Sequence, residues 1–173
     1  EKTQIIDVEP DKLNDHSLDQ QSDKTPINED ILDLISDELN LNHHEKEPAV
    51  KYQIDWLLSN PVYLKNVLQK SEPYIYYIHK KIKQNDFPSE LTLLPVIESA
   101  YDPLAYSQSH ASGLWQFIPS TAKYLGLERS LWFDARRDVV ESTNVAIDYL
   151  KYLNQRFSND WLLTLAAYNG GEG

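Results

Sequence analysis

Glu98 is the residue whose neighbours most clearly suggest chemistry. Leu91, Leu94 and Pro95 lie seven, four and three positions before it, so a helix through this segment would project the Glu98 carboxylate from its apolar face. Burial raises the pKa of a carboxyl group because a low dielectric disfavours the charged form. A carboxylic acid that is still protonated near neutral pH can act as a general acid. The alternative is a glutamate at a helix end that reaches water or a neighbouring backbone N–H.

A serine-rich loop and a glycine precede a run of aromatic residues downstream of Glu98. Residues 107–112 are small and polar, and Gly113 stands before Trp115, Gln116 and Phe117. Such a loop suits the floor of a groove in which backbone groups approach a polar ligand. The two aromatic rings would then stack on sugar faces, or one or both would pack in the core.

A third polar segment lies near the end of the chain. Residues 166–171 combine small residues with the phenol of Tyr168 and the amide of Asn169. These side chains would extend the groove, or they would belong to an ordinary helix end with an asparagine near its cap.

A general acid often works with a second carboxylate, which serves as nucleophile or as base for water. Asp102 lies four residues after Glu98 but is followed by Pro103, which favours a turn or helix end. Asp134 and Asp138 lie beside two arginines, which favours ion pairs. No second catalytic carboxylate is therefore apparent.

Helices must position these residues, since no alternating strand pattern of useful length is present. Apolar residues at helical spacing, caps and prolines predict helices near residues 61–69, 73–84, 88–98, 119–125, 139–157 and 161–169. Ile75, Ile78 and Ile82 form the buried stripe of the second. Pro95 is expected to bend the third just before Glu98. The fold class is all-α.

The composition excludes several classes of protein. The chain has 173 residues, 41% of them hydrophobic, so it is not wholly disordered. With no Cys it has no disulfide, thiolate zinc site or cysteine nucleophile. Its net charge of −11 argues against binding to nucleic acid. No apolar run approaches the length of about 18 residues that a membrane span requires.

The acidity is concentrated before residue 50. Residues 1–50 hold 4 Lys and 14 acidic residues, and all the aromatic residues lie after them. We therefore predict an acidic, mostly disordered linker over residues 1–47, followed by the folded domain from residue 48. Within the linker, residues 29–41 have apolar positions at helical spacing, but the preferred interpretation is a solvated segment.

Two histidines of the predicted linker stand beside acidic residues. His43 and His44 precede Glu45 and Glu47, which is compatible with a metal cluster. A solvated polar run is the favoured interpretation because nothing holds these side chains in place. We predict no metal site and no cofactor.

Three segments occur in the order and approximate spacing found in the lysozyme-like lytic transglycosylases, which residues 50–173 resemble. They are Glu98-Ser99, Gly113-Leu114-Trp115-Gln116 and Ala167-Tyr168-Asn169-Gly170-Gly171. The flanking residues 93–103, 134–139 and 160–163 resemble the same family. One such motif is weak, whereas three in register form a strong signal.

The resemblance implies a lysozyme-like catalytic domain over residues 48–173 and roles for six residues within it. Glu98 matches the single catalytic acid/base, and Ser107 matches a position that contacts the substrate near the reacting sugar. Residues that bind the glycan strand are then Ser99, Ser107, Gln116, Tyr168 and Asn169. A fourth motif, with a tyrosine on a later helix, is expected beyond Gly173. We accordingly expect the chain to be a piece of a longer protein, incomplete at the C-terminus of its catalytic domain.

The resemblance also implies a reaction on peptidoglycan. Glu98 would protonate the glycosidic oxygen between N-acetylmuramic acid and N-acetylglucosamine, and would then act as base on the muramic C6 hydroxyl, which closes onto C1. Two alternatives are a goose-type-like muramidase, which delivers water, and a glycan-binding module without turnover.

Location and partners follow from that substrate. A glycan strand outside the cytoplasmic membrane implies the periplasm of a Gram-negative bacterium. We expect a signal or lipoprotein anchor to the outer membrane upstream, and peptidoglycan-binding LysM repeats downstream.

Overall fold

The structure is a computed structural model that describes residues 27–171. Helices joined by loops make up its regular structure, and no strand is present in that range. In chain order the helices are α1 (Ile27–Asp37), α2 (Pro48–Ser59), α3 (Pro61–Ser71), α4 (Ile75–Gln84), η1 (Ser89–Leu93), α5 (Leu94–Ser99), α6 (Pro119–Tyr124), η2 (Ala135–Arg137), α7 (Val139–Arg156) and α8 (Trp161–Gly170), where η marks a 3₁₀-helix. The predicted all-α class is confirmed. Among the described helices, none combines the length and apolar character that crossing a bilayer requires.

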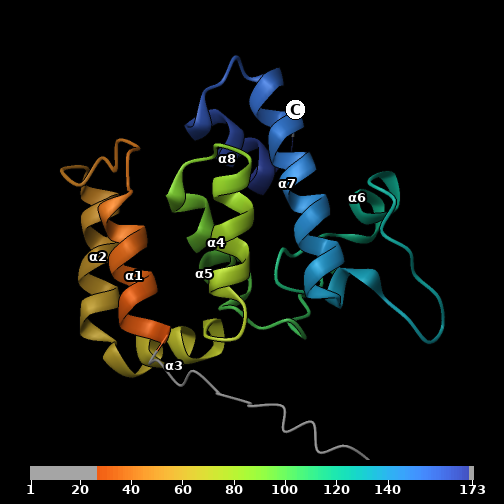
Figure 1. Ribbon diagram of the computed structural model, residues 1–173, viewed down its shortest axis with the longest axis horizontal. Helices are drawn as coiled ribbons and strands as arrows, with labels where there is room; N and C mark the ends of the chain where they lie inside the picture. Colours follow the sequence, from red (N-terminus) through yellow and green to blue (C-terminus); the bar gives the residue numbers. More distant parts are fainter. Residues whose placement is uncertain (1–26, 172–173) are drawn as a thin grey trace, which may run out of the picture.

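Helix α4 forms the centre of the core. In Figure 1 it stands in the middle of the molecule, with α1 and α2 on one side and α7 on the other. Ile75, Ile78 and Ile82 are all 0% exposed, as their spacing predicts. Full burial of an isoleucine side chain contributes about 1.5–3 kcal/mol, so this helix face contributes to the apolar stabilisation through all three residues.

The two C-terminal helices begin at aspartates that cap them. The Asp138 carboxylate accepts a hydrogen bond from the backbone N–H of Glu141 at 2.8 Å at the start of α7. Asp160 accepts from the backbone N–H groups of Leu162 and Leu163 at 2.9 and 3.0 Å at the start of α8. Such caps satisfy backbone donors that have no partner within the helix. Both helices therefore start where the sequence predicts.

Helix α1 corrects the interpretation of residues 29–41 as a solvated segment. Ile31 and Ile35, one turn apart, are 3% and 2% exposed and belong to the same hydrophobic core as α4. The solvated interpretation is wrong because the stripe gains its stability from a partner helix that lies far away in the sequence. The packed domain thus begins before residue 48. Residues 1–26 of the predicted linker lie outside the described residues.

The end of α1 and the chain that follows it are bound to the 3₁₀-helix η1. The Ser89 hydroxyl donates a hydrogen bond to Glu38 Oε2 at 2.8 Å. Glu90 Oε1 accepts from the backbone N–H groups of Asn40 and Leu41 at 2.7 Å each. These backbone donors hold the pKa of Glu90 below its usual range, although burial opposes them. The segment after α1 is therefore fixed by charge-assisted hydrogen bonds.

The single helix predicted over residues 88–98 is divided into η1 and α5. Pro95 lies in the first turn of α5, where its missing N–H removes no intrahelical hydrogen bond. The predicted bend takes the form of this change from 3₁₀- to α-helix. Glu98 follows on the last turn of α5, two residues before a left-handed residue, Ala100, at φ 50°.

Gly113 allows its loop to pack closely against η2. Its φ is +82°, and a Cβ atom placed on it would overlap the backbone carbonyl of Arg136. Only glycine fits such a position, since both the left-handed backbone and the close approach exclude a side chain. The loop that carries Trp115 and Gln116 is thereby packed directly on η2.

We expect Ile35→Ala to lower the free energy of unfolding by about 2–5 kcal/mol, because a fully buried side chain is truncated. Leu34→Ala on the same helix is the matched control, since Leu34 is 43% exposed; it should cost about 0.5 kcal/mol. Urea denaturation of both variants measures the difference. Equal effects of the two changes would contradict the packing of α1 on the core.

Gly113→Ala should lower the free energy of unfolding by about 3 kcal/mol or more, since about 1–2 kcal/mol of backbone strain adds to about 1–3 kcal/mol of overlap. Gly126→Ala is the control: its φ is +84°, but nothing lies within 4 Å of the added Cβ. That variant should show the backbone strain alone. Thermal or urea unfolding that finds the two variants equally stable would refute the close approach at Gly113.

Candidate active site

A cavity of about 260 Å³ opens beside Glu98, between the end of α5, the loop before α6, the middle of α7 and the end of α8. It is lined by Glu98, Trp115, Gln116, Phe117, Ile118, Thr121, Tyr149, Tyr168, Asn169, Gly170 and Gly171. Glu98 is the one carboxylate among these lining residues. The three segments that carry the sequence motifs therefore meet at one place, although up to about 70 residues separate them.

The Glu98 side chain is half-buried, and burial raises its pKa above the ordinary value of 4.5. No hydrogen bond or ion pair to a described residue stabilises its charged form. Desolvation therefore acts unopposed, which is the condition that keeps a carboxyl group protonated. A carboxylic acid in this state can donate a proton to a bound ligand.

Tyr168 joins α8 to the opposite wall of the cavity. Its hydroxyl donates a hydrogen bond to the backbone carbonyl of Trp115 at 2.9 Å. Its ring lies 5.7 Å from that of Tyr149 and 6.2 Å from that of Phe117, between ring centroids. Burial, and secondly the charge of Glu98, raise the pKa of Tyr168 well above its usual value. The phenol therefore keeps its proton, and its hydrogen bond holds the Trp115 backbone in place.

Gln116 and Asn169 offer amide groups to the cavity. Gln116 adopts a left-handed backbone, at φ 49°, and its Nε2 donates to the carbonyl of Gly113 at 2.8 Å. Its Oε1 accepts no hydrogen bond from the described residues. Asn169 is exposed at the end of α8. Both side chains therefore retain polar atoms for a ligand.

Ser99 and Ser107 do not line this cavity. The Ser99 hydroxyl donates to the backbone carbonyl of Leu114 at 2.9 Å and is also 3.1 Å from that of Pro95. Ser107 Oγ accepts from the backbone N–H of Ala111 at 3.0 Å and closes the serine-rich loop. In this structure each hydroxyl holds backbone in place beside the site.

The two aromatic residues of the predicted groove floor are core residues. Trp115 is 1% exposed, and its indole N–H donates to Thr143 Oγ1 at 2.9 Å. Phe117 is 3% exposed. The alternative of packing in the core is therefore the correct one, and neither ring has a face free to stack on a sugar.

Residues that the sequence analysis did not select also line the cavity. Ile118 and Thr121 come from the start of α6, and Tyr149 comes from α7. Tyr149 directly precedes Leu150, which belongs to the apolar stripe of α7. Its position at the edge of this buried stripe is the sequence feature that could have identified Tyr149.

The aspartates considered as second carboxylates are engaged elsewhere. Asp102 accepts from the backbone N–H of Leu104 at 2.9 Å and from Lys70 Nζ at 3.0 Å, and these contacts lower its pKa. Asp134 is paired with Arg136 at 2.7 Å, and that hydrogen bond lowers its pKa. Neither aspartate lines the cavity beside Glu98.

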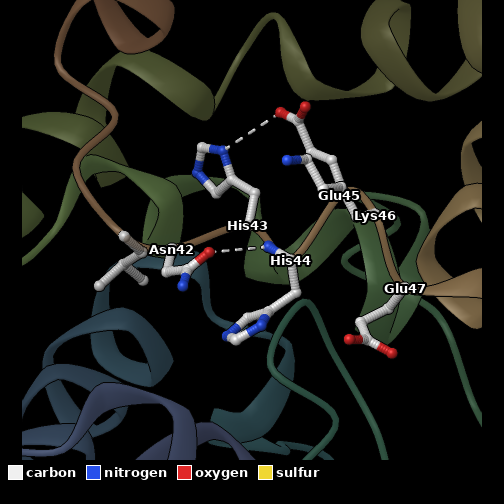
Figure 2. Close-up of a pocket in the computed structure, with 7 residues that line it drawn as sticks. Asn42, His43, His44, Glu45, Lys46 and Glu47 are labelled. Atoms are coloured by element: carbon white, nitrogen blue, oxygen red, sulfur yellow. Dashed lines mark hydrogen bonds and ion pairs between the residues drawn. The ribbon is translucent and has the colours of Figure 1, made fainter.

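A second hollow, of about 460 Å³, is formed by residues 41–47 between α1 and α2. Figure 2 shows that its two histidines diverge: His43 turns toward Glu45, at 4.0 Å, whereas His44 points to the other side of the chain. His43 Nε2 also lies 3.1 Å from Glu90 Oε1. No group of three His, Asp or Glu side chains suited to a metal ion occurs among the described residues.

Comparison with known proteins agrees with this geometry. The family described as Transglycosylase SLT domain matches residues 75–173. "Membrane-bound lytic murein transglycosylase D" of Escherichia coli (strain K12) is 46% identical over 144 residues, which cover 83% of this chain and 32% of that protein. "Putative tributyltin chloride resistance protein" of Alteromonas sp. (strain M-1) is 44% identical over 121 residues, or 70% of this chain and 54% of that protein.

A more distant relative matches a shorter stretch of the chain. "Soluble lytic murein transglycosylase" of Escherichia coli (strain K12) is 34% identical over 80 residues, 44% of this chain and 12% of that protein. The chain thus spans about a third of the first relative and about half of the second. Because the family match includes all three motifs and more than half of the residues, the chain belongs to the transglycosylase SLT domain family.

Proposed function

We propose that the protein is a lytic murein transglycosylase that cleaves the β-1,4 bond between N-acetylmuramic acid and N-acetylglucosamine. The observation that carries this proposal is a single half-buried carboxyl group, Glu98, with a raised pKa in a cavity lined by amides and a phenol. The names of the relatives from Escherichia coli support the same substrate.

In the first step Glu98 acts as a general acid. Its proton passes to the glycosidic oxygen as the bond from that oxygen to C1 of the muramic sugar breaks, so the departing sugar leaves with a neutral 4-hydroxyl group. The positive charge that develops at C1 is stabilised by the neighbouring N-acetyl group of the substrate. Glu98 is then a carboxylate.

In the second step the same carboxylate acts as a base. It removes the proton from the C6 hydroxyl of the muramic sugar while O6 forms a bond to C1, which yields the 1,6-anhydro ring. The proton returns to Glu98, no water is consumed, and the enzyme is ready for another turnover. One carboxyl group suffices because the nucleophile belongs to the substrate.

The surrounding residues divide into ligand-binding and positioning groups in this proposal. Gln116, Tyr168 and Asn169 bind the glycan strand along the cavity. Ser99 and Ser107 act by fixing the backbone on either side of the loop that carries Gln116, and thus hold the site open for the sugar.

Two rival functions differ in their products. A muramidase would deliver water to C1 and release a reducing sugar, and it would need a base for that water. A glycan-binding module would release nothing. The occupied aspartates, Asp102 and Asp134, favour the reaction without water.

The proposed substrate also gives the location and partners of the whole protein. Peptidoglycan lies outside the cytoplasmic membrane, so we propose a periplasmic enzyme of the bacterial envelope. A lipoprotein anchor before this chain and LysM repeats after it remain predictions for the full-length protein.

Glu98→Gln in the full-length protein should lower the release of anhydromuropeptides by about a hundredfold or more, since the general acid is lost. Mass spectrometry of digested peptidoglycan measures these products. Glu128→Gln, at an exposed glutamate that does not line the cavity, is the control and should leave them unchanged. Reducing-end products from the unmodified enzyme would instead establish the muramidase, and the absence of any product would leave the binding module.

The raised pKa of Glu98 also predicts a pH dependence of stability that does not require turnover. Between the unfolded pKa near 4.5 and the raised folded pKa, the folded state binds more protons, so stability falls as pH rises. Glu98→Gln removes this loss. Its stability relative to the unmodified protein should therefore increase with pH across that window and then level off. Urea denaturation over a pH series measures the difference, and a difference that is flat or decreasing would show that the Glu98 pKa is not raised.

A further inference from the structure

The α2–α3 hairpin contributes little to the core. Helix α2 has no buried residue, and α3 buries only Val67 and Ser71. Both helices also lie before residue 75, where the family match begins. Because this pair of helices adds so little apolar burial, it is a candidate for a role other than stabilising the core.

A cavity of about 480 Å³ separates α3 from the turn that follows Glu98. It is lined by Tyr63, Asn66, Val67, Gln69, Lys70 and Ala100. Ala100 lies two residues after Glu98, so the Cα atoms of these two residues are at most about 7.6 Å apart. The cavity therefore lies close to Glu98 along the chain, although its lining shares no residue with that of the cavity beside Glu98.

The geometry of this second cavity is fixed from both sides. Lys70 Nζ on α3 contacts Asp102 Oδ2 at 3.0 Å. Ala100 and Tyr101 both have left-handed backbones, with φ of 50° and 58°. The Tyr101 ring is fully buried, and its hydroxyl donates to the carbonyl of Thr92 at 2.6 Å. Two consecutive left-handed residues other than glycine persist only where surrounding contacts hold them.

The lining has the chemistry of a site for an N-acetylated sugar. The exposed ring of Tyr63 offers an apolar surface and packs edge-on against Trp56, with 5.3 Å between centroids. The exposed amides of Asn66 and Gln69 have no hydrogen-bond partner among the described residues, and amides can bond both hydroxyl and acetamido groups. Lys70 is neutralised by Asp102, so the lining carries no unpaired charge. This neutrality favours a sugar over an acidic stem peptide.

We propose that this cavity, on α3, is a subsite for a further N-acetylated sugar of the same glycan strand, next to the bond that is cleaved. The inference rests on the proposed function, because the strand is the proposed substrate. The α2–α3 hairpin then extends the binding groove beyond the part of the chain that the family match covers.

Binding of the N-acetylglucosamine hexamer to the full-length Glu98→Gln protein tests this proposal without turnover. Adding Asn66→Ala should raise the dissociation constant, measured by calorimetry, by about five- to tenfold, the effect of one lost hydrogen bond. Asn144→Ala, the same change at an exposed position of α7, is the matched control and should have no effect. In the protein without Asn66→Ala, the side-chain amide NMR signals of Asn66 and Gln69 should shift during the titration.

The proposal is overturned if Asn66→Ala binds the hexamer as tightly as the control does, or if the two amide signals stay in place. It is also overturned if these signals respond only to muropeptides that carry stem peptides, which would identify a peptide site instead. The amide signals need no variant at α3, so a folding defect cannot obscure the result. The proposed function is tested separately by the anhydro products, whose absence would leave the binding result intact.

Discussion

The site depends on the ion pair and hydrogen bonds of the buried Arg136 guanidinium. Its Nε and Nη2 bond both oxygens of Asp134 at 2.9 and 2.7 Å, and its Nη1 donates to the backbone carbonyls of His110 and Phe117 at 2.7 and 2.9 Å. A buried charge is stable only when it is paired and its donors are satisfied. The loop over residues 107–118 supplies the two carbonyl acceptors, and its Gly113 packs on the backbone carbonyl of Arg136.

The environment of Glu98 follows from this arrangement. With the loop fixed on Arg136, the carbonyl of Leu114 accepts from Ser99 on α5, and that of Trp115 accepts from Tyr168 on α8. Two hydrogen bonds to backbone carbonyls of the loop thus connect α5, which carries Glu98, with α8, which closes the cavity. Desolvation, the cause of the raised pKa of Glu98, requires this closure. The acid is therefore tuned by the packing of three segments and not by a neighbouring charge.

Local patterns predicted the helices well where the pattern and its cap lie in the same segment. Asp160 and the apolar residues of α8 are within a few positions of one another. The motifs likewise brought Glu98, Gln116, Tyr168 and Asn169 to one cavity. Prediction failed for Ile31 and Ile35, since their partner helix lies about 40 residues away and an acidic composition concealed their burial.

The backbone contacts of the serines could not be predicted for a related reason. Ser99 and Ser107 form hydrogen bonds with backbone groups, and the sequence does not reveal which carbonyl or N–H a hydroxyl will reach. Trp115 shows the same limit, because its indole packs in the core, where Thr143 Oγ1 accepts its N–H.

The early helix α1 supports the site through the 3₁₀-helix η1. Hydrogen bonds from Ser89 to Glu38, and from the chain after α1 to Glu90, fix η1, which continues directly into α5 and Glu98. The change from η1 to α5 interrupts the ladder of helical hydrogen bonds. The contacts of α1 and the chain after it with η1 therefore provide rigidity that an uninterrupted helix would have had. The segment that composition assigned to a linker is thus part of the frame that holds Glu98.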